Sequence, residues 1–191
     1  MSKYLRAGNE LPLNLSPGMV VALKSTRFGR AGNNSNPSSP HGTRTNLDLR
    51  NVNNDILLRI TLLASKNEVV FNDRADISLL DGWGEAQSVK LSQVDVDRWM
   101  RLGFTISVHD CSTPSKDQYQ ILFDLTTIYY FDKRFPGPAI NIIHSTQLPT
   151  GWDGHLYESS DWSLLSDPLE VFIYNLDDLP HMEKQAIKSG L

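Results

Sequence analysis

The chain has 191 residues, of which 40% are hydrophobic and 21% are charged. These proportions are ordinary for a globular protein, and the length fits one domain with its own core. The net charge of −4 argues against a protein that binds nucleic-acid phosphates, and the absence of a run of about 18 apolar residues argues against membrane insertion.

Strand-like segments dominate the chain. They are short, rich in β-branched and aromatic residues, and separated by Gly, Pro, Asn and Asp, which is typical of a sandwich or barrel. In chain order these segments are 19–24, 56–63, 68–72, 104–109, 119–124, 127–131, 139–144 and 169–174. Parallel sheets need long crossover connections, and no segment is long and helical enough to supply them. An antiparallel sandwich is therefore expected.

Two stretches are expected to be long loops. The segment 29–45 is rich in Asn, Ser, Gly and Pro and has no apolar periodicity, which predicts a surface loop. The segment 148–168 carries Trp152, Tyr157 and Trp162 among Gly, Ser and Asp, so its aromatic residues either pin the loop to the body or extend a ligand surface. Short helices are expected at 94–102 and at 180–188, inside a C-terminal tail at 180–191.

Three neighbouring strand-like segments place polar groups on a common face. Because side chains alternate along a strand, Arg59, Thr61 and Leu63 point one way and the apolar residues between them point into the core. The same alternation joins Val70, Asn72 and Arg74 on the next segment. It joins Trp83, Glu85 and Gln87 on the third. An open face with a Trp, an amide, a carboxylate and guanidinium groups is therefore predicted.

Such a face suits a saccharide. A pyranose ring has an apolar C–H patch that stacks on an aromatic side chain, here Trp83. Its hydroxyl groups need donors and acceptors of fixed geometry, which Asn72, Glu85 and Arg59 can supply. Each of these residues also has a plainer reading, as a packing Trp, a turn Asn or a solvated surface charge.

The segment 54–91 resembles galectins, and fungal galectins more closely than animal ones. The family pattern is a His-x-Asn/Ser-x-Arg strand, a Val-x-Asn strand and then Trp-x-x-Glu-x-Arg. Here Arg59, Thr61 and Leu63 stand for the first motif, Val70 and Asn72 for the second, and Trp83, Glu85 and Gln87 for the third. Arg59 replaces the His, and Leu63 and Gln87 replace the two Arg residues that hold the Glu, so Glu85 is expected to need Arg59 or Arg74 as its partner.

The resemblance covers about 150 residues, including 15–25 and 104–143. It implies an all-β fold, an antiparallel β-sandwich of the galectin and concanavalin-like jelly-roll type, in one domain over 1–191. It also implies a lectin whose partner is an oligosaccharide or glycoconjugate, with β-galactoside-type ligands and an altered specificity. The candidate carbohydrate-binding residues are Arg59, Thr61, Asn72, Arg74, Trp83, Glu85 and Gln87.

The alternative is a galectin-fold module that binds a protein partner and has no sugar affinity, because both family arginines are missing. A glycosidase is disfavoured, since hydrolysis needs two carboxylates and the face offers only Glu85. The five histidines lack metal-binding spacing, so neither a metal nor a cofactor is expected.

The single cysteine, Cys111, and the lack of an apolar signal segment in 1–10 predict a cytoplasmic protein. Release without a signal peptide and homo-oligomer formation, both suggested by the resemblance, stay open.

Overall fold

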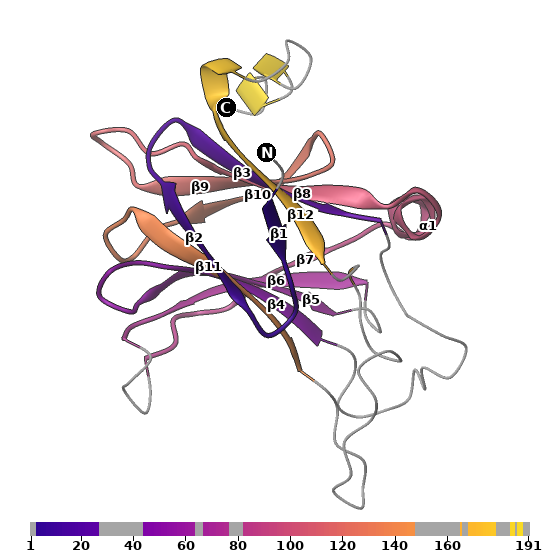
Figure 1. Cartoon of the computed structure of the whole chain (residues 1–191), viewed down its shortest axis with the longest axis horizontal. Coiled ribbons are helices and arrows are strands. Elements are labelled where there is room, and N and C mark those ends of the chain that lie inside the picture. Colours follow the sequence, from indigo (N-terminus) through magenta and orange to yellow (C-terminus); the bar gives the residue numbers. More distant parts are fainter. Residues whose placement is uncertain are drawn as a thin grey trace, which may run out of the picture.

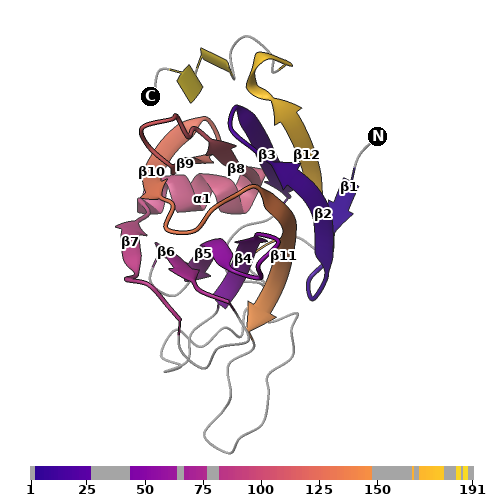
Figure 2. The same cartoon turned by 90° about the vertical axis from the view of Figure 1, so that its left-hand side faces the viewer.

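The computed structural model describes residues 3–26, 44–63, 67–76, 82–147, 165, 168–178, 184–185 and 187–188. Within these residues the strands form two six-stranded antiparallel sheets that pack face to face (Figures 1 and 2). The first sheet is ordered β1 (Lys3–Leu5), β12 (Leu169–Asn175), β3 (Met19–Ser25), β8 (Phe104–Asp110), β9 (Gln118–Phe123) and β10 (Thr126–Asp132). The second sheet is ordered β2 (Glu10–Leu15), β11 (Ala139–Gln147), β4 (Arg44–Arg50), β5 (Ile56–Leu63), β6 (Glu68–Arg74) and β7 (Gln87–Lys90).

The core lies between the two sheets and is filled by alternate residues of each strand. On β5 the residues Leu58, Ile60 and Leu62 are fully buried, as the period-two pattern predicted. On β6 the ring of Phe71 stacks on Tyr129 of β10, with centroids 4.8 Å apart and planes 7° apart. This contact joins the two sheets. The residues of β5 and β6 that alternate with the buried ones, such as Arg59 and Asn72, therefore face outward.

One end of the sandwich is closed by helix α1 (Gln93–Leu102), which connects β7 to β8 (Figure 1). The helix begins after Ser92, whose side chain accepts a hydrogen bond from the Asp95 N–H. Its Trp99 is buried against Phe104, and the indole Nε1–H donates to Asp124 Oδ2 at 2.7 Å. The predicted helix at 94–102 is confirmed.

The structure confirms the all-β antiparallel sandwich and the eight predicted strands, whose ends differ by a few residues at most. It adds three strands that were not predicted, namely β1, β2 and β4, and it places the strand expected around Trp83, Glu85 and Gln87 later in the chain, as β7. The predicted loop 29–45 is wrong at its end, because Arg44 and Thr45 begin β4 and pair with β5 and β11. Positions 29–43 lie outside the described residues.

Of the predicted loop 148–168 the structure describes only Leu165 and Pro168, so Trp152, Tyr157 and Trp162 lie outside the described residues. Leu165 is fully buried and belongs to the core. The four described residues of the C-terminal tail, which include Ile187, are helical. No helix among the described residues is long and apolar enough to cross a bilayer.

Candidate functional site

The outer face of the second sheet, which points away from the first sheet, carries most of the predicted site residues. Strand pairing aligns its side chains into three rows that cross the strands. The first row contains Asn141, Arg50, Ile56, Arg74 and Trp83. The second row contains Ile143, Asp48, Arg59 and Asn72. The third row contains Ser145, Asn46, Thr61, Val70 and Ser88.

Arg59 and Asn72, from different strands, are directly opposite each other in the pairing of β5 with β6. Directly paired residues of antiparallel strands point to the same face, with Cβ atoms about 5 Å apart. Trp83 forms an isolated antiparallel bridge with Arg74, at the outer edge of the same region. The structure therefore brings Arg59, Thr61, Asn72, Arg74 and Trp83 together on one face.

Arg59 is held by a carboxylate. Its Nε and Nη2 donate to the two carboxylate oxygens of Asp48 on β4, both at 2.7 Å. The side chain of Asp48 is 2% exposed and that of Arg59 is 25% exposed. A bidentate pair of this kind combines charge with fixed geometry, so the guanidinium has one orientation. Of the two partners expected for Glu85, Arg59 or Arg74, the first is thus bound to Asp48 instead.

The side chain of Trp83 is 38% exposed. It belongs to a short segment that is hydrogen-bonded to the end of β6. The Ala75 N–H donates to Gly82 O and the Gly84 N–H donates to Asp73 O, each at 2.9 Å. Arg134 links this segment to β6. Its Nη2 donates a hydrogen bond to Gly82 O at 3.2 Å and forms an ion pair with Asp73 Oδ1 at 2.8 Å. A Cβ atom on residue 84 would overlap Asp73 Oδ1, so a larger residue there would displace the Asp73 carboxylate.

Two guanidinium groups lie over the indole ring of Trp83. The Cζ of Arg59 is 4.6 Å from the ring centroid, and the Cζ of Arg74 is 5.2 Å from it. Both distances fall within the range of a cation–π interaction. The ring is thus partly covered by cations, and a ligand that stacks on Trp83 also contacts these guanidinium groups.

The amide and hydroxyl groups of the face are partly engaged already. Asn72 Oδ1 accepts a hydrogen bond from the Asp73 N–H at 2.9 Å, which leaves its Nδ2 as the donor for a ligand. The Thr61 hydroxyl donates to Asn46 Oδ1 at 2.8 Å, which orients both side chains. The face therefore offers amide and guanidinium N–H donors of fixed direction beside an exposed aromatic ring, which is what hydroxyl-rich ligands require.

The predicted grouping of Trp83, Glu85 and Gln87 on one strand face is wrong. Residues 84–86 are not in a strand, so the alternation is interrupted before β7 begins at Gln87. Gln87 pairs with the buried Phe71 and so lies on the inner face, which removes it from the candidate site. Glu85 is exposed and makes no ion pair with any other described residue.

Three site residues on β4 were missed from the sequence, namely Asn46, Asp48 and Arg50. They alternate with Thr45, Leu47 and Leu49, which are buried, so the segment has the period of a strand with one polar face. That alternation was the available signal, but the polar composition of the preceding residues hid it.

The groups with shifted pKa values lie on β8 and β9 or beside them, away from the outer face of the second sheet. Burial lowers the pKa of His109 and raises the pKa of both Cys111 and Tyr119. His109 Nδ1 is 2.9 Å from Gln120 Oε1, and Lys133 Nζ is 3.1 Å from Asp110 Oδ2 in a buried ion pair. These contacts stabilise the interior. No cluster among the described residues could hold a metal ion.

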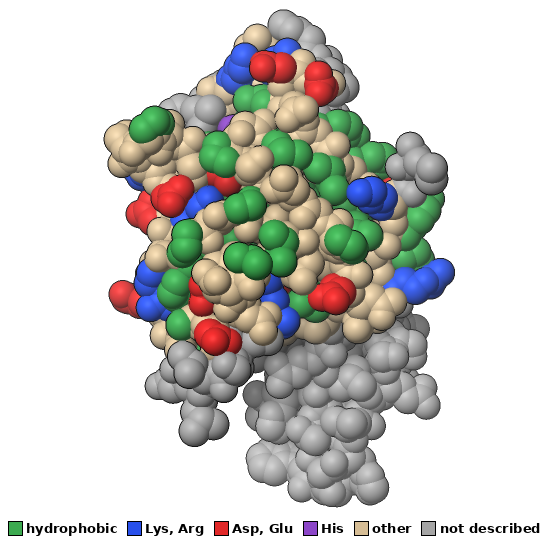
Figure 3. Space-filling model, turned by 60° about the vertical axis from the view of Figure 1, so that its left-hand side comes forward, with side chains coloured by type: hydrophobic (Ala, Val, Ile, Leu, Met, Phe, Trp, Pro, Cys, Tyr) green, Lys and Arg blue, Asp and Glu red, His purple; other side chains and the backbone are tan. Residues whose placement is uncertain are grey.

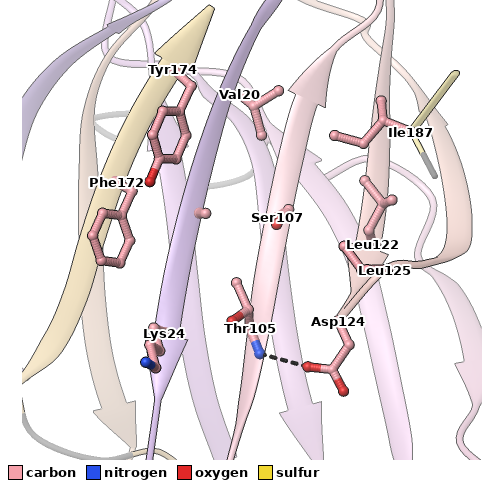
Figure 4. Close-up of a pocket in the computed structure, with 11 residues that line it drawn as sticks. Val20, Lys24, Thr105, Ser107, Leu122, Asp124, Leu125, Phe172, Tyr174 and Ile187 are labelled. Atoms are coloured by element: carbon pink, nitrogen blue, oxygen red, sulfur yellow. Dashed lines mark hydrogen bonds between the residues drawn. The ribbon is translucent and has the colours of Figure 1, made fainter. Parts of the chain in front are cut away.

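A separate groove of about 400 Å³ lies on the outer face of the first sheet (Figure 4). Phe172 and Tyr174 lie along one side of it, stacked with centroids 6.0 Å apart. Ile187 of the C-terminal tail packs on Val20 and Leu122 and covers part of the floor. The groove is mainly apolar, whereas the outer face of the second sheet carries the polar groups.

No protein-family model matches the chain. Among solved structures it is similar to a double variant of human galectin-16, with 17% identity and a TM-score of 0.54 over 91% of this chain and 99% of that one. Caenorhabditis elegans galectin LEC-6 has 15% identity and a TM-score of 0.53 over 90% of this chain and 95% of that one. Xenopus laevis galectin-Ib has 11% identity and a TM-score of 0.52 over 91% of this chain and 100% of that one. The chain therefore has the fold of these galectins.

Proposed function

We propose that this chain is a carbohydrate-binding lectin that receives its ligand on the outer face of the second sheet. The galectin fold supports the proposal, because Arg59, Thr61, Asn72 and Trp83 of the galectin-like motifs lie on that face. The single observation that carries it is the convergence of Arg59, Asn72 and Trp83 from three separate segments. The same proposal includes galactoside-type ligands and a role in binding without catalysis. It also includes a nearer relation to fungal galectins than to animal ones.

In the proposed complex Trp83 supplies the apolar surface and the neighbouring polar groups fix the ring. The C–H face of a pyranose contacts the exposed part of the indole. Asn72 Nδ2 and the guanidinium of Arg59 donate hydrogen bonds to hydroxyl oxygens. Because Asp48 holds Arg59 in one orientation, little further ordering is needed when the ligand binds.

A second candidate function is a galectin-fold module that binds a protein and no sugar. It is favoured by the two guanidinium groups that lie over Trp83, since they compete with a sugar for the ring. The two functions differ in their response to free saccharide. A partner captured by the wild-type chain and retained in excess mono- and oligosaccharide would support the second function.

The test is binding to a broad glycan array by the wild type and by Trp83→Ala. The expected result is binding by the wild type and a loss of about tenfold in affinity for the variant, from the lost aromatic contact and buried area. Tyr4→Ala is the matched control, because Tyr4 is an exposed aromatic residue on β1 of the first sheet. Equal binding by all three proteins, each shown to be folded by circular dichroism, would exclude the site.

The proposal includes an oligomer in a cytoplasmic setting, with release by a route without a signal peptide left open. A lectin with one site per subunit gains avidity from assembly on a multivalent surface. Light scattering after size-exclusion chromatography measures the subunit number directly.

A further inference from the structure

We infer that the outer face of the first sheet holds a second binding site, for an amphiphile with an aliphatic chain and an uncharged, hydroxyl-bearing head group. The aliphatic chain binds in the apolar groove beside Phe172 and Tyr174, and the head group binds in a polar hollow that adjoins this groove. The inference is independent of the proposed lectin function, because it concerns the other sheet.

The groove has two high walls and a low floor. One row of paired residues crosses it, in the order Phe172 on β12, Ala22 on β3, Ser107 on β8 and Leu122 on β9. The two outer residues of the row are large and apolar and the two central ones are small, so the row forms a trough (Figure 4). A trough between an aromatic and an aliphatic wall fits a narrow apolar chain.

One end of the groove already holds an aliphatic side chain of the protein itself. Ile187 is buried against Val20 and Leu122, and its carbonyl oxygen accepts a hydrogen bond from Gln120 Nε2 at 3.2 Å. From this contact the groove runs on over Ala22, with a volume of about 400 Å³. An aliphatic chain in this volume extends the same apolar contact and removes further hydrocarbon surface from water.

The groove also differs from the surface on the side of the sandwich. On the flank shown in Figure 3, hydrophobic side chains are interspersed with polar and charged ones. In the groove, Phe172, Tyr174 and Leu125 line a single concavity, and Leu125 is 49% exposed. Apolar side chains that gather in a hollow with polar groups at one end are typical of a ligand site.

The other end of the groove leads into the polar hollow, which has a volume of about 420 Å³. The groove and the hollow share Lys24, Thr105 and Asp124 in their linings, so one ligand can occupy both. Val20 and Lys24 are four residues apart on β3, which corresponds to about 13 Å along the strand. An extended chain that starts beside Val20 therefore has its head group at Lys24.

The polar hollow is surrounded by charges of both signs. Its lining includes Lys24 and Asp124. Glu170 on β12 is directly opposite Lys24, and the exposed Arg101 precedes the lining residue Leu102. An anionic head group would lie beside two carboxylates, and a cationic head group would lie beside two basic side chains. The balance of charge therefore favours a head group without charge.

Asp124 can bind a hydroxyl group in this hollow. Its Oδ1 accepts a hydrogen bond from the Thr105 N–H at 3.0 Å, and its Oδ2 accepts one from Trp99 Nε1 at 2.7 Å. These bonds fix the carboxylate, and each oxygen can accept a further hydrogen bond. A hydroxyl group can donate to Asp124 and accept from Lys24 at once, which neither a carboxylate nor a quaternary ammonium group can do.

The experiment measures calorimetric affinities of the wild type for monooctanoylglycerol, octanoate and octyltrimethylammonium, each below the concentration at which it forms micelles. The aliphatic chains are closely matched in length, whereas the head groups are neutral, negative and positive. We expect monooctanoylglycerol to bind about tenfold more tightly than either charged amphiphile, because a charged head group loses a hydrogen bond and meets like charges.

Ala22→Leu tests the groove, because the larger side chain fills its floor. It is expected to lower the affinity for monooctanoylglycerol by about tenfold or more. Ala86→Leu is the matched control, since Ala86 is exposed and lies beside the second sheet, and it is expected to behave as the wild type. Lys24→Met tests the hollow and is expected to shift the preference from octanoate toward octyltrimethylammonium. Circular dichroism shows whether each variant is folded.

The inference would be overturned if none of the amphiphiles bound saturably, or if all of them bound equally well. An affinity that Ala22→Leu does not lower would overturn it too, because the chain would then bind elsewhere. A charge preference that Lys24→Met leaves unchanged would overturn the placement of the head group. Trp83→Ala is expected to retain the affinity for monooctanoylglycerol, so failure of the proposed glycan site would leave this inference standing.

Discussion

The ion pair between Asp48 and Arg59 is expected to be one of the strongest polar contributions to stability in the second sheet. Removing one partner of a fully buried pair costs about 3–5 kcal/mol, because the other charge is left buried. Asp48 is 2% exposed but Arg59 is 25% exposed, so water reaches the guanidinium after Asp48→Ala. We therefore expect a smaller loss, about 2 kcal/mol.

The assay is urea unfolding followed by circular dichroism. With a slope of about 2 kcal/mol per molar urea, a loss of about 2 kcal/mol lowers the midpoint by about 1 M. The matched control is Asp95→Ala, because Asp95 and Arg98 form an exposed pair one turn apart on α1 at 3.0 Å. Such a pair contributes about 0.3–0.5 kcal/mol, so the midpoint is expected to fall by about 0.25 M or less.

A double-mutant cycle with Arg59→Ala separates the pair from the effect of each residue alone. The expected coupling free energy between Asp48 and Arg59 is about 2 kcal/mol, several times that of Asp95 and Arg98. A coupling no larger than that of the exposed pair would refute the reasoning, since Arg59 would then not depend on Asp48 for its position.

Two further predictions concern the support of the site and the interior. Gly84→Ala is expected to lower glycan affinity about as much as Trp83→Ala, and stability by about 1–3 kcal/mol, because the new Cβ displaces Asp73 and the segment that carries the indole. An unchanged affinity and midpoint would contradict this. Burial lowers the pKa of His109, so the neutral ring is favoured in the folded state. Its contribution to stability is complete above the ordinary pKa of about 6.5 and is lost as the pH falls through the lowered pKa. The melting temperature of His109→Gln should therefore fall less than that of the wild type between neutral and mildly acidic pH, and parallel curves would exclude this role.

The sandwich was predictable because its central strands have strict alternation. From Leu58 to the end of β5, and along all of β6, each buried residue is followed by a more exposed one, so the face that carries Arg59 and Asn72 could be read from parity alone. The same rule failed at Gln87, because parity holds only along a continuous strand. Residues 84–86 are not in a strand, so the alternation that begins at Trp83 is interrupted. The side chain of Gln87 therefore lies on the inner face of the sheet, opposite to that of Trp83.

The partner of Arg59 could not be predicted by the same means. Asp48 is 11 residues away in the sequence and reaches Arg59 only because β4 pairs beside β5. Once a family motif suggested Glu85 as the partner, the nearer carboxylate on an unrecognised strand was overlooked. The register of neighbouring strands, rather than the composition of any one of them, decides which charges meet.

The most direct test of the proposed site follows the indole N–H signal of Trp83 by NMR while a glycan that binds is titrated into the protein. The signal is assigned by its loss in Trp83→Phe, and the buried Trp99 serves as the internal reference. The proposal predicts a saturable shift of the Trp83 signal with an unchanged Trp99 signal. Saturable shifts confined to the groove beside Phe172 and Tyr174 on the first sheet, with Trp83 unmoved, would contradict it.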